Sequence, residues 1–224
     1  MTMTRNRTLF FFLTVFVVIS LLLVWSQVYD GKTRFLAGTK PFRPPAPIIL
    51  PQLPPLRPFD SIRGGTGSDV ITVVEFADFT CPGCRAVEPE VIKLLQELGP
   101  RVRLVWRNLP LGQESPSTIV TILAAQCAKD QGKFWEMHDE LLKTQQLDLD
   151  RMTKLASKIG LNSSTFTACL SSPDQLTRIQ DDIRIAEQYH LKSAPVFFIG
   201  REVMAGYVTS KQLKASVERA VFKK

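Results

Sequence analysis

A predicted strand that leads into two closely spaced cysteines and then a helix is the feature that most constrains this chain. Residues 70–76, VITVVEF, are rich in β-branched side chains and predict a buried strand. Cys81 and Cys84 follow it, and apolar residues then recur at helical spacing up to a Gly-Pro stop. Residues 101–107 predict a second strand. The segment is therefore expected to form a β-α-β unit within an α/β fold.

The residues that follow predict a block of helices and then a return to strands. Five helices are expected, the third with Asp150 as its N-cap, over residues 116–129, 134–145, 150–160, 163–171 and 173–189. Strands are expected over 195–199 and 202–208, before a final helix that starts near residue 210. The expected order is β-α-β, a helical block, and β-β-α.

The chemistry of the chain is expected at its paired cysteines. Cys81 falls at the start of a predicted helix, where unpaired N–H groups and the helix dipole favour a thiolate and lower the pKa of the thiol. Cys84 lies one turn on, and a disulfide that closes so short a loop contributes only about 2 kcal/mol, which suits cycling better than structural support. A zinc site is the alternative, but it needs a second pair, and Cys127 and Cys169 stand isolated in predicted helices.

The N-terminal part of the chain predicts a membrane anchor. Residues 9–25 form an uncharged apolar run, at the short end of the ~17–25 residues that span a bilayer. Arg5 and Arg7 precede it, so residues 1–8 are expected in the cytoplasm, with residues 9–28 spanning the membrane once and the remainder outside. A cleaved signal peptide is the alternative, but the run is longer than a usual apolar core of ~7–15 residues and bulky residues follow it.

A proline-rich segment separates the apolar run from the predicted domain. Eight prolines fall between residues 41 and 58, which excludes a helix or a central strand there. Residues 29–59 are expected to form an extended linker, whose proline-rich part would reach roughly 55 Å at ~3.1 Å per residue. A ligand for an SH3-type domain is the alternative. The formal net charge is +7, but no dense basic run accompanies it, so nucleic-acid binding is not expected.

The cysteine segment resembles a known family. Residues 75–84, EFADFTCPGC, resemble the active-site segment of DsbA-like thiol–disulfide oxidoreductases, which belong to the thioredoxin superfamily. The resemblance extends over residues 60–224 and includes Pro89, an Ala-Pro pair before an apolar strand, and the segment GKFWEMHD. It implies a thioredoxin-like fold with an all-helical insertion at about residues 113–190. It also implies an enzyme that needs no metal and no organic cofactor.

The resemblance assigns roles to individual residues. It implies that Cys81 is the exposed nucleophile and that Cys84 is its redox partner. Glu75 stands in an apolar run, where an unpaired carboxyl has a raised pKa, and the resemblance implies that it relays protons to Cys84. Ala194 and Pro195 are implied to form a cis-proline loop that binds the substrate backbone.

Two positions depart from the family pattern. Gly83 follows Pro82 at a position where the family often has histidine, and glycine cannot help to stabilise a thiolate. Ala194 replaces the threonine or valine that usually precedes the cis-proline. Both positions are expected to tune the active site, and we expect a less extreme oxidant than a CPHC enzyme.

Cys127 and Cys169 are expected to form a structural disulfide. An oxidising compartment would permit the bond, which also resembles a pair found in some family members. Closing a loop of about 43 residues contributes about 4 kcal/mol in the chain-entropy description. Two buried thiols are the alternative.

The expected function is oxidation of thiols outside the cytoplasm. The substrates would be unfolded exported proteins with free thiols, and a quinone-linked membrane partner of the DsbB or VKOR kind would re-oxidise the enzyme. The expected location is the cytoplasmic, or inner, membrane, with the C-terminal domain on the periplasmic side. One alternative is a reductase or isomerase that a membrane electron donor keeps reduced. The other is a non-enzymatic tethered chaperone.

Overall fold

The structure, a computed structural model, describes residues 16, 18–23, 25–26, 48–49, 53–110, 115–172 and 174–221. The chain divides into two compact units, residues 1–45 and 46–224. The described residues of the first unit are helical. Among all the described residues, no helix has both the length and the apolar character that a membrane crossing requires. The predicted cytoplasmic N-terminus, most of the predicted anchor at 9–28 and most of the linker at 29–59 lie outside the described residues.

A mixed sheet forms the centre of the second unit. Its strands are β1 (Ile48–Ile49), β2 (Ser61–Gly64), β3 (Ile71–Ala77), β4 (Val102–Asn108), β5 (Val196–Ile199) and β6 (Glu202–Ala205). They lie side by side in the order β1-β6-β5-β3-β4-β2, in which β3 and β4 are parallel and the other neighbours are antiparallel. Both faces of the sheet are covered, which explains why the central strand β3 reads as a nearly continuous apolar run.

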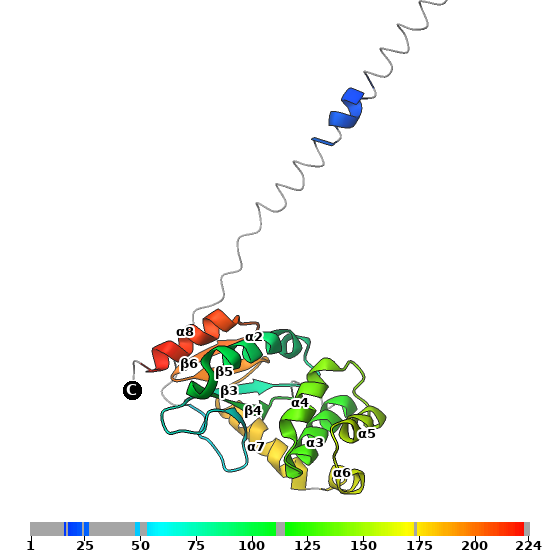
Figure 1. The fold of residues 1–224 in the computed structure, drawn as a ribbon, viewed down its shortest axis with the longest axis vertical. Coiled ribbons are helices and arrows are strands. Elements are labelled where there is room, and N and C mark those ends of the chain that lie inside the picture. Colours follow the sequence, from blue (N-terminus) through cyan, green and yellow to red (C-terminus); the bar gives the residue numbers. More distant parts are fainter. Residues whose placement is uncertain are drawn as a thin grey trace, which may run out of the picture. The chain divides into compact units, whose positions relative to one another are not determined.

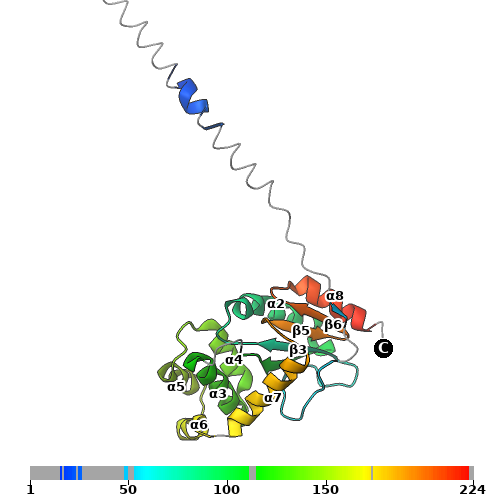
Figure 2. The same cartoon turned by 180° about the vertical axis from the view of Figure 1, so that it is seen from behind.

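Helices cover both faces of the sheet and extend beyond one end of it (Figure 1). They are α2 (Pro82–Leu98), the 3₁₀ helix η1 (Gly99–Arg101), α3 (Pro116–Asp130), α4 (Phe134–Lys143), α5 (Leu149–Lys158), α6 (Ser163–Leu170), α7 (Asp174–Gln188) and α8 (Ser210–Val221). Val87 and Val91 of α2 share a core cluster with Leu213 of α8 on one face, and Ala186 of α7 packs with Phe198 on the other. Figure 2 shows α7 on the face opposite α2 and α8. Helices α3 to α6 gather into a helical block, whereas α7, the last of the five helices predicted for the insertion, packs on the sheet.

The structure differs from the sequence prediction at several element ends. Asp148, not Asp150, is the N-cap of α5, because its Oδ1 accepts a hydrogen bond from the amide of Arg151 at 2.8 Å. The strand predicted over 202–208 ends at Ala205, since Gly206 follows with a φ of +79°. Strands β1 and β2 were not predicted, because one holds two residues and the other, SIRG, has a single β-branched side chain.

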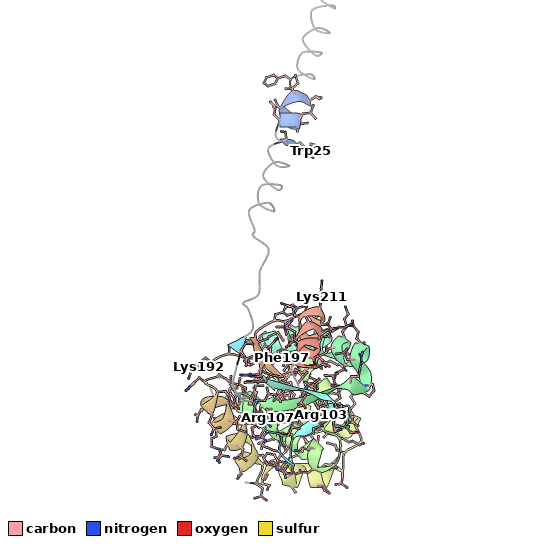
Figure 3. The ribbon with its side chains drawn as sticks, turned by 90° about the vertical axis from the view of Figure 1, so that its left-hand side faces the viewer. Trp25, Arg103, Arg107, Lys192, Phe197 and Lys211 are labelled. Atoms are coloured by element: carbon pink, nitrogen blue, oxygen red, sulfur yellow. A yellow bond between two sulfur atoms is a disulfide. The ribbon has the colours of Figure 1, made fainter. Side chains whose placement is uncertain are left out.

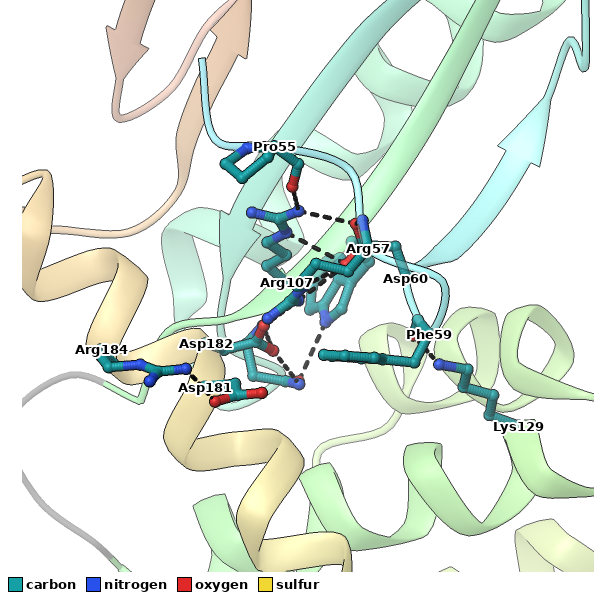
Figure 4. Close-up of polar contacts among 11 residues, drawn as sticks. Pro55, Arg57, Phe59, Asp60, Arg107, Lys129, Asp181, Asp182 and Arg184 are labelled. Atoms are coloured by element: carbon teal, nitrogen blue, oxygen red, sulfur yellow. Dashed lines mark hydrogen bonds and ion pairs between the residues drawn. The ribbon is translucent and has the colours of Figure 1, made fainter. Parts of the chain in front are cut away.

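Residues 53–60, which we name the strap, belong to the second unit and lie against the rest of it. In Figure 3, Arg107 lies inside the unit while Lys192 and Lys211 project from its surface. Arg107 pairs there with Asp60 of the strap, with 2.7 Å between Nη2 and Oδ2. Arg57 of the strap joins Asp60 to Asp182 of α7 (Figure 4). The linker predicted to run to residue 59 is therefore shorter than expected, since its last residues are part of the folded unit.

Candidate active site

The turn between β3 and α2 positions the two cysteines. Oδ1 of Asp78 accepts hydrogen bonds from the amide and the hydroxyl of Thr80, both at 2.7 Å. Arg85 of α2 donates from Nε and Nη2 to the carbonyl of Phe79, at 3.0 and 2.9 Å. These contacts tie both sides of the turn to the fold, and they leave Cys81 as the N-cap of α2.

The sulfur of Cys81 lies where the helix begins and faces the loop before β5. Its Sγ accepts a hydrogen bond from the amide of Cys84 at 3.4 Å. The same atom lies 3.6 Å from the carbonyl oxygen of Ala194, which precedes Pro195 through a cis peptide bond, as the resemblance implies. Cys81 is partly exposed, whereas Cys84 is buried. An incoming thiol therefore has access to one sulfur of the pair but not to the other.

The two residues between the cysteines lie at the surface of this site. Pro82 is exposed and occupies the first position of α2. Gly83 is half-buried, and a Cβ at this position would lie 3.6 Å from Cδ of Pro195 and 3.7 Å from Sγ of Cys81. Both distances are ordinary van der Waals contacts. Gly83 thus lies between the nucleophile and the cis-proline, and a larger side chain there would contact both.

Beneath the surface, Glu75 and Cys84 face each other across the layer between β3 and α2. Strand alternation places Glu75 on the same side of β3 as Val73, which packs in the α2 cluster. Cys84 and Val87 are on the sheet-facing side of α2. Glu75 is fully buried, and neither of its carboxyl oxygens has a hydrogen-bond partner among the described residues.

Burial controls the protonation of both groups. It raises the pKa of Cys84 above the usual thiol value, and the nearby sulfur of Cys81 and carboxyl of Glu75 raise it further. Burial also raises the pKa of Glu75 well above the usual carboxyl value, and the charge of Glu88 adds to the effect. Cys84 and Glu75, the inner half of the site, therefore hold their protons.

A second group of titratable side chains adjoins this pair. Glu88 lies one turn after Cys84 on α2 and is 8% exposed. Burial and the charge of Asp139 together raise its pKa to about 7, against the opposing charges of Arg63 and Lys143. The sequence signal for Glu88 was available, because an acid four residues after Cys84 falls on the apolar, sheet-facing side of the helix.

Asp139 is held by two neighbours from different elements. Nδ1 of His138 lies 2.9 Å from its Oδ1, and Nη2 of Arg63 on β2 lies 2.9 Å from its Oδ2. Burial lowers the pKa of His138, which favours the neutral ring. The pKa of Asp139 is lowered to about 2, because hydrogen bonds and charge from His138 and Arg63 outweigh its partial burial. No sequence pattern linked Arg63 to the adjacent pair His138 and Asp139, since Arg63 comes from a distant part of the chain.

Glu88, His138 and Asp139 are also the described residues with the spacing of a metal site. One potential ligand atom from each lies within 4.8 Å of the others. Both carboxyl oxygens of Asp139 are already bonded, however, and one of them pairs with the positive charge of Arg63. The arrangement therefore satisfies the acid internally and disfavours a cation.

The other two cysteines join the helices of the insertion. Cys127 of α3 and Cys169 of α6 form a disulfide with a Cα–Cα distance of 5.7 Å, as expected from the sequence. Cys127 is fully buried and Cys169 is half-buried against the same cluster. This bond ties α6 to α3, and Cys81 and Cys84 are the free cysteines among the described residues.

Comparisons with known proteins agree with this geometry. A family model described as thioredoxin matches residues 60–219. The Na(+)/H(+) antiporter NhaA 1 of Salinispora arenicola (strain CNS-205) is 36% identical over 162 residues, which cover 72% of this chain and 24% of that protein. The chain therefore spans about a quarter of the length of the curated relatives that it matches.

Two solved structures show the same fold. A thioredoxin-like oxidoreductase from Silicibacter pomeroyi DSS-3 has a TM-score of 0.68 at 26% identity, over 75% of this chain and 95% of that one. BdbD from Bacillus subtilis, in an oxidised crystal structure, has a TM-score of 0.64 at 16% identity, over 73% of this chain and 93% of that one.

Proposed function

The chain belongs to the thioredoxin superfamily, with DsbA-like thiol–disulfide oxidoreductases among its structural neighbours, and from this premise we propose that it introduces disulfides into other proteins. The observation that carries the proposal is the contrast between the two sulfurs. Cys81 is partly exposed at a helix N-terminus beside a cis-proline, and Cys84 is buried over Glu75. A helix N-terminus stabilises a thiolate, so Cys81 is the better leaving group and the better target.

The reaction follows from that contrast. A substrate thiolate attacks Sγ of Cys81, the bond to Cys84 breaks, and its electron pair goes to the sulfur of Cys84. Glu75, which holds its proton because it is buried, protonates that sulfur. A second substrate thiolate then attacks the substrate sulfur of the mixed disulfide, and Cys81 leaves as a thiolate. The substrate loses two electrons and gains a disulfide, and the cysteine pair is reduced.

Substitution of each cysteine tests this scheme in the full-length protein. With a reduced peptide that contains two thiols, Cys81→Ser is expected to abolish oxidation. With a peptide that contains a disulfide, Cys84→Ser is expected to attack one peptide sulfur through Cys81 and release the other as a thiol, which leaves a mixed disulfide that Cys84 cannot resolve and that mass spectrometry detects. A Cys81→Ser protein that still oxidises the peptide would overturn the proposal, as would a Cys84→Ser protein that traps nothing.

The direction of electron flow is tested by the equilibrium of Cys81–Cys84 with glutathione and by trapping the pair in cells. We expect a pair that is mainly oxidised in the cell, and a less oxidising potential than that of an enzyme with histidine in place of Gly83. A mainly reduced pair would instead assign a reductase or isomerase. Function that survives loss of both cysteines would assign a chaperone.

We also propose that residues 9–28 anchor the protein in the cytoplasmic membrane and that the oxidoreductase domain lies outside the cytoplasm. The uncharged run after Arg5 and Arg7 supports this arrangement. A quinone-linked membrane protein of the DsbB or VKOR kind would then accept electrons from Cys81–Cys84. After intact cells are treated with a reductant that opens the Cys81–Cys84 disulfide, labelling of the active-site thiol by a reagent that does not cross the membrane is expected, and labelling only after lysis would contradict the topology.

A further inference from the structure

Two buried carboxyl groups lie along the inner side of the active-site helix, and only one of them reaches the surface. Glu75 is 0% exposed, whereas Glu88 retains 8% of its surface. Oε2 of Glu88 is buried and has no partner within the described part of the chain, as is true of both oxygens of Glu75. A proton that Cys84 gains from Glu75 must be replaced from solvent, and Glu75 has no contact with solvent.

Glu88 lies where it can connect the buried Glu75 to solvent. Cys84 and Glu88 are separated by one helical turn, so both project from the side of α2 that faces the sheet. Glu75 projects from β3 into the same layer, and the charge of Glu88 acts on it directly. Glu88 is therefore the group that lies between the buried Cys84–Glu75 pair and water.

Asp139 is the fixed negative charge next to Glu88. It projects from α4 of the helical block, and its two oxygens are held by His138 and by Arg63, each at 2.9 Å. Arg63 is itself held over the ring of Trp135, with 4.4 Å from its guanidinium carbon to the ring centre. This framework prevents Asp139 from turning away. The other charged groups that act on Glu88 are Arg63 and Lys143.

We propose that Asp139 is a positioning residue that holds Glu88 as the group through which protons pass between the Cys84–Glu75 pair and solvent. The inference rests on the proposed function and extends it. When the disulfide is reduced, Glu75 gives its proton to the sulfur of Cys84, Glu88 gives its proton to Glu75, and Glu88 regains one from water. When the pair is oxidised, the same proton moves in the opposite direction.

Glu88 suits this role because it exchanges protons near neutral pH. Its pKa is raised to about 7 by burial and by the charge of Asp139, so both protonation states are populated under ordinary conditions. Arg63 acts on Glu88 with the opposite sign. Removal of Asp139 and removal of Arg63 should therefore move the titration of Glu88 in opposite directions, which a general loss of structure would not do.

The test uses the full-length protein and dithiothreitol as the dithiol. The rate at which dithiothreitol reduces Cys81–Cys84 is measured across pH, and the carboxyl of Glu88 is titrated by carbon-13 NMR. Asp139→Asn is expected to move both the inflection and the titration down by about one pH unit. Arg63→Gln is expected to move both upward, and Glu88→Gln is expected to remove the inflection.

Glu97→Gln is the matched control, because Glu97 lies on the same helix but pairs with Lys214 away from the site. It is expected to leave the profile unchanged, and near-ultraviolet circular dichroism checks the fold of every variant. An Asp139→Asn protein with an unshifted titration, or with a shift in the same direction as Arg63→Gln, would overturn the inference. If the wild-type protein failed to react with any dithiol, the proposed function would be overturned. The NMR titration of Glu88 would still decide this inference.

Discussion

At the scale of single residues, the site separates two sulfurs of the same type by their surroundings. Cys81 stands at the helix N-terminus and is partly exposed to solvent. Burial favours the protonated form of Cys84, and of Glu75 beside it. The sequence predicted all three residues, because a strand, a turn and a helix cap are local patterns. It did not predict Glu88 or Asp139, whose effect depends on contacts between elements.

Replacement of Glu75 by glutamine should slow the reaction of the cysteine pair while it increases the stability of the folded protein relative to wild type at high pH. The raised pKa means that the folded protein holds this proton more tightly than the unfolded chain does, so wild-type stability falls as pH rises above the usual carboxyl pKa. Glu75→Gln removes that dependence, and its stability relative to wild type should increase from pH 5 to pH 9 in urea unfolding. Its reaction with dithiothreitol should slow about 10²-fold, because the proton donor to Cys84 is lost.

The same unfolding and rate measurements on Glu97→Gln provide the comparison. Glu97 is more than a third exposed, so its replacement should change neither the pH dependence nor the rate. A Glu75→Gln protein that reacts as fast as wild type would exclude Glu75 as the proton donor.

At the scale of elements, the periodicity of apolar residues was sufficient to predict the long helices and the buried strands. It was not sufficient to predict the short strands or the residues that cap the helices. The strand and helix on either side of Cys81 lie within a residue or two of their predicted ends. Residues 147–150 alternate leucine and aspartate, and the sequence analysis placed the cap of α5 at Asp150, two residues too late. The choice depends on backbone geometry, and Asp148 has the extended conformation that an N-cap requires.

The cap of α5 can be tested by a pair of matched substitutions. Asp148→Ala removes the hydrogen bond to the amide of Arg151 and should lower the free energy of unfolding by about 1 kcal/mol. Asp150→Ala removes an exposed ion pair with Lys154 and should cost less than about 0.5 kcal/mol. Urea unfolding of both variants measures the difference. A larger loss at Asp150 would contradict the assignment of the cap.

At the scale of the second unit, distant segments are joined by polar contacts that no local pattern reveals. The strap reaches β4 through Arg107 and α7 through Asp182, and the disulfide joins α3 to α6. Burial raises the pKa of Asp182 despite its bonds to Arg57 and Asn108. Proline content suggested that residues up to 59 extend freely, but proline does not prevent a segment from packing, and a buried Arg–Asp pair fixes this one.

The pair between Asp60 and Arg107 should be among the most sensitive polar contacts of the strap. Both side chains are fully buried, and loss of one member leaves the other charge uncompensated, which costs about 3–5 kcal/mol. Asp60→Asn should therefore lower the free energy of unfolding by about 3 kcal/mol at pH 7. The exposed Asp150→Asn, as the control, should change it by less than about 0.5 kcal/mol.

The pH dependence of this loss identifies its cause. Burial alone would raise the pKa of Asp60, but bonds and charge from Arg107 and Arg57 lower it below the usual value. The stabilisation is therefore present above about pH 4, where the unfolded carboxyl is ionised, and is lost as pH falls through the lower folded pKa. Wild type and Asp60→Asn should converge in stability toward pH 2. If the difference between them were constant from pH 7 to pH 2, packing rather than charge would hold the strap.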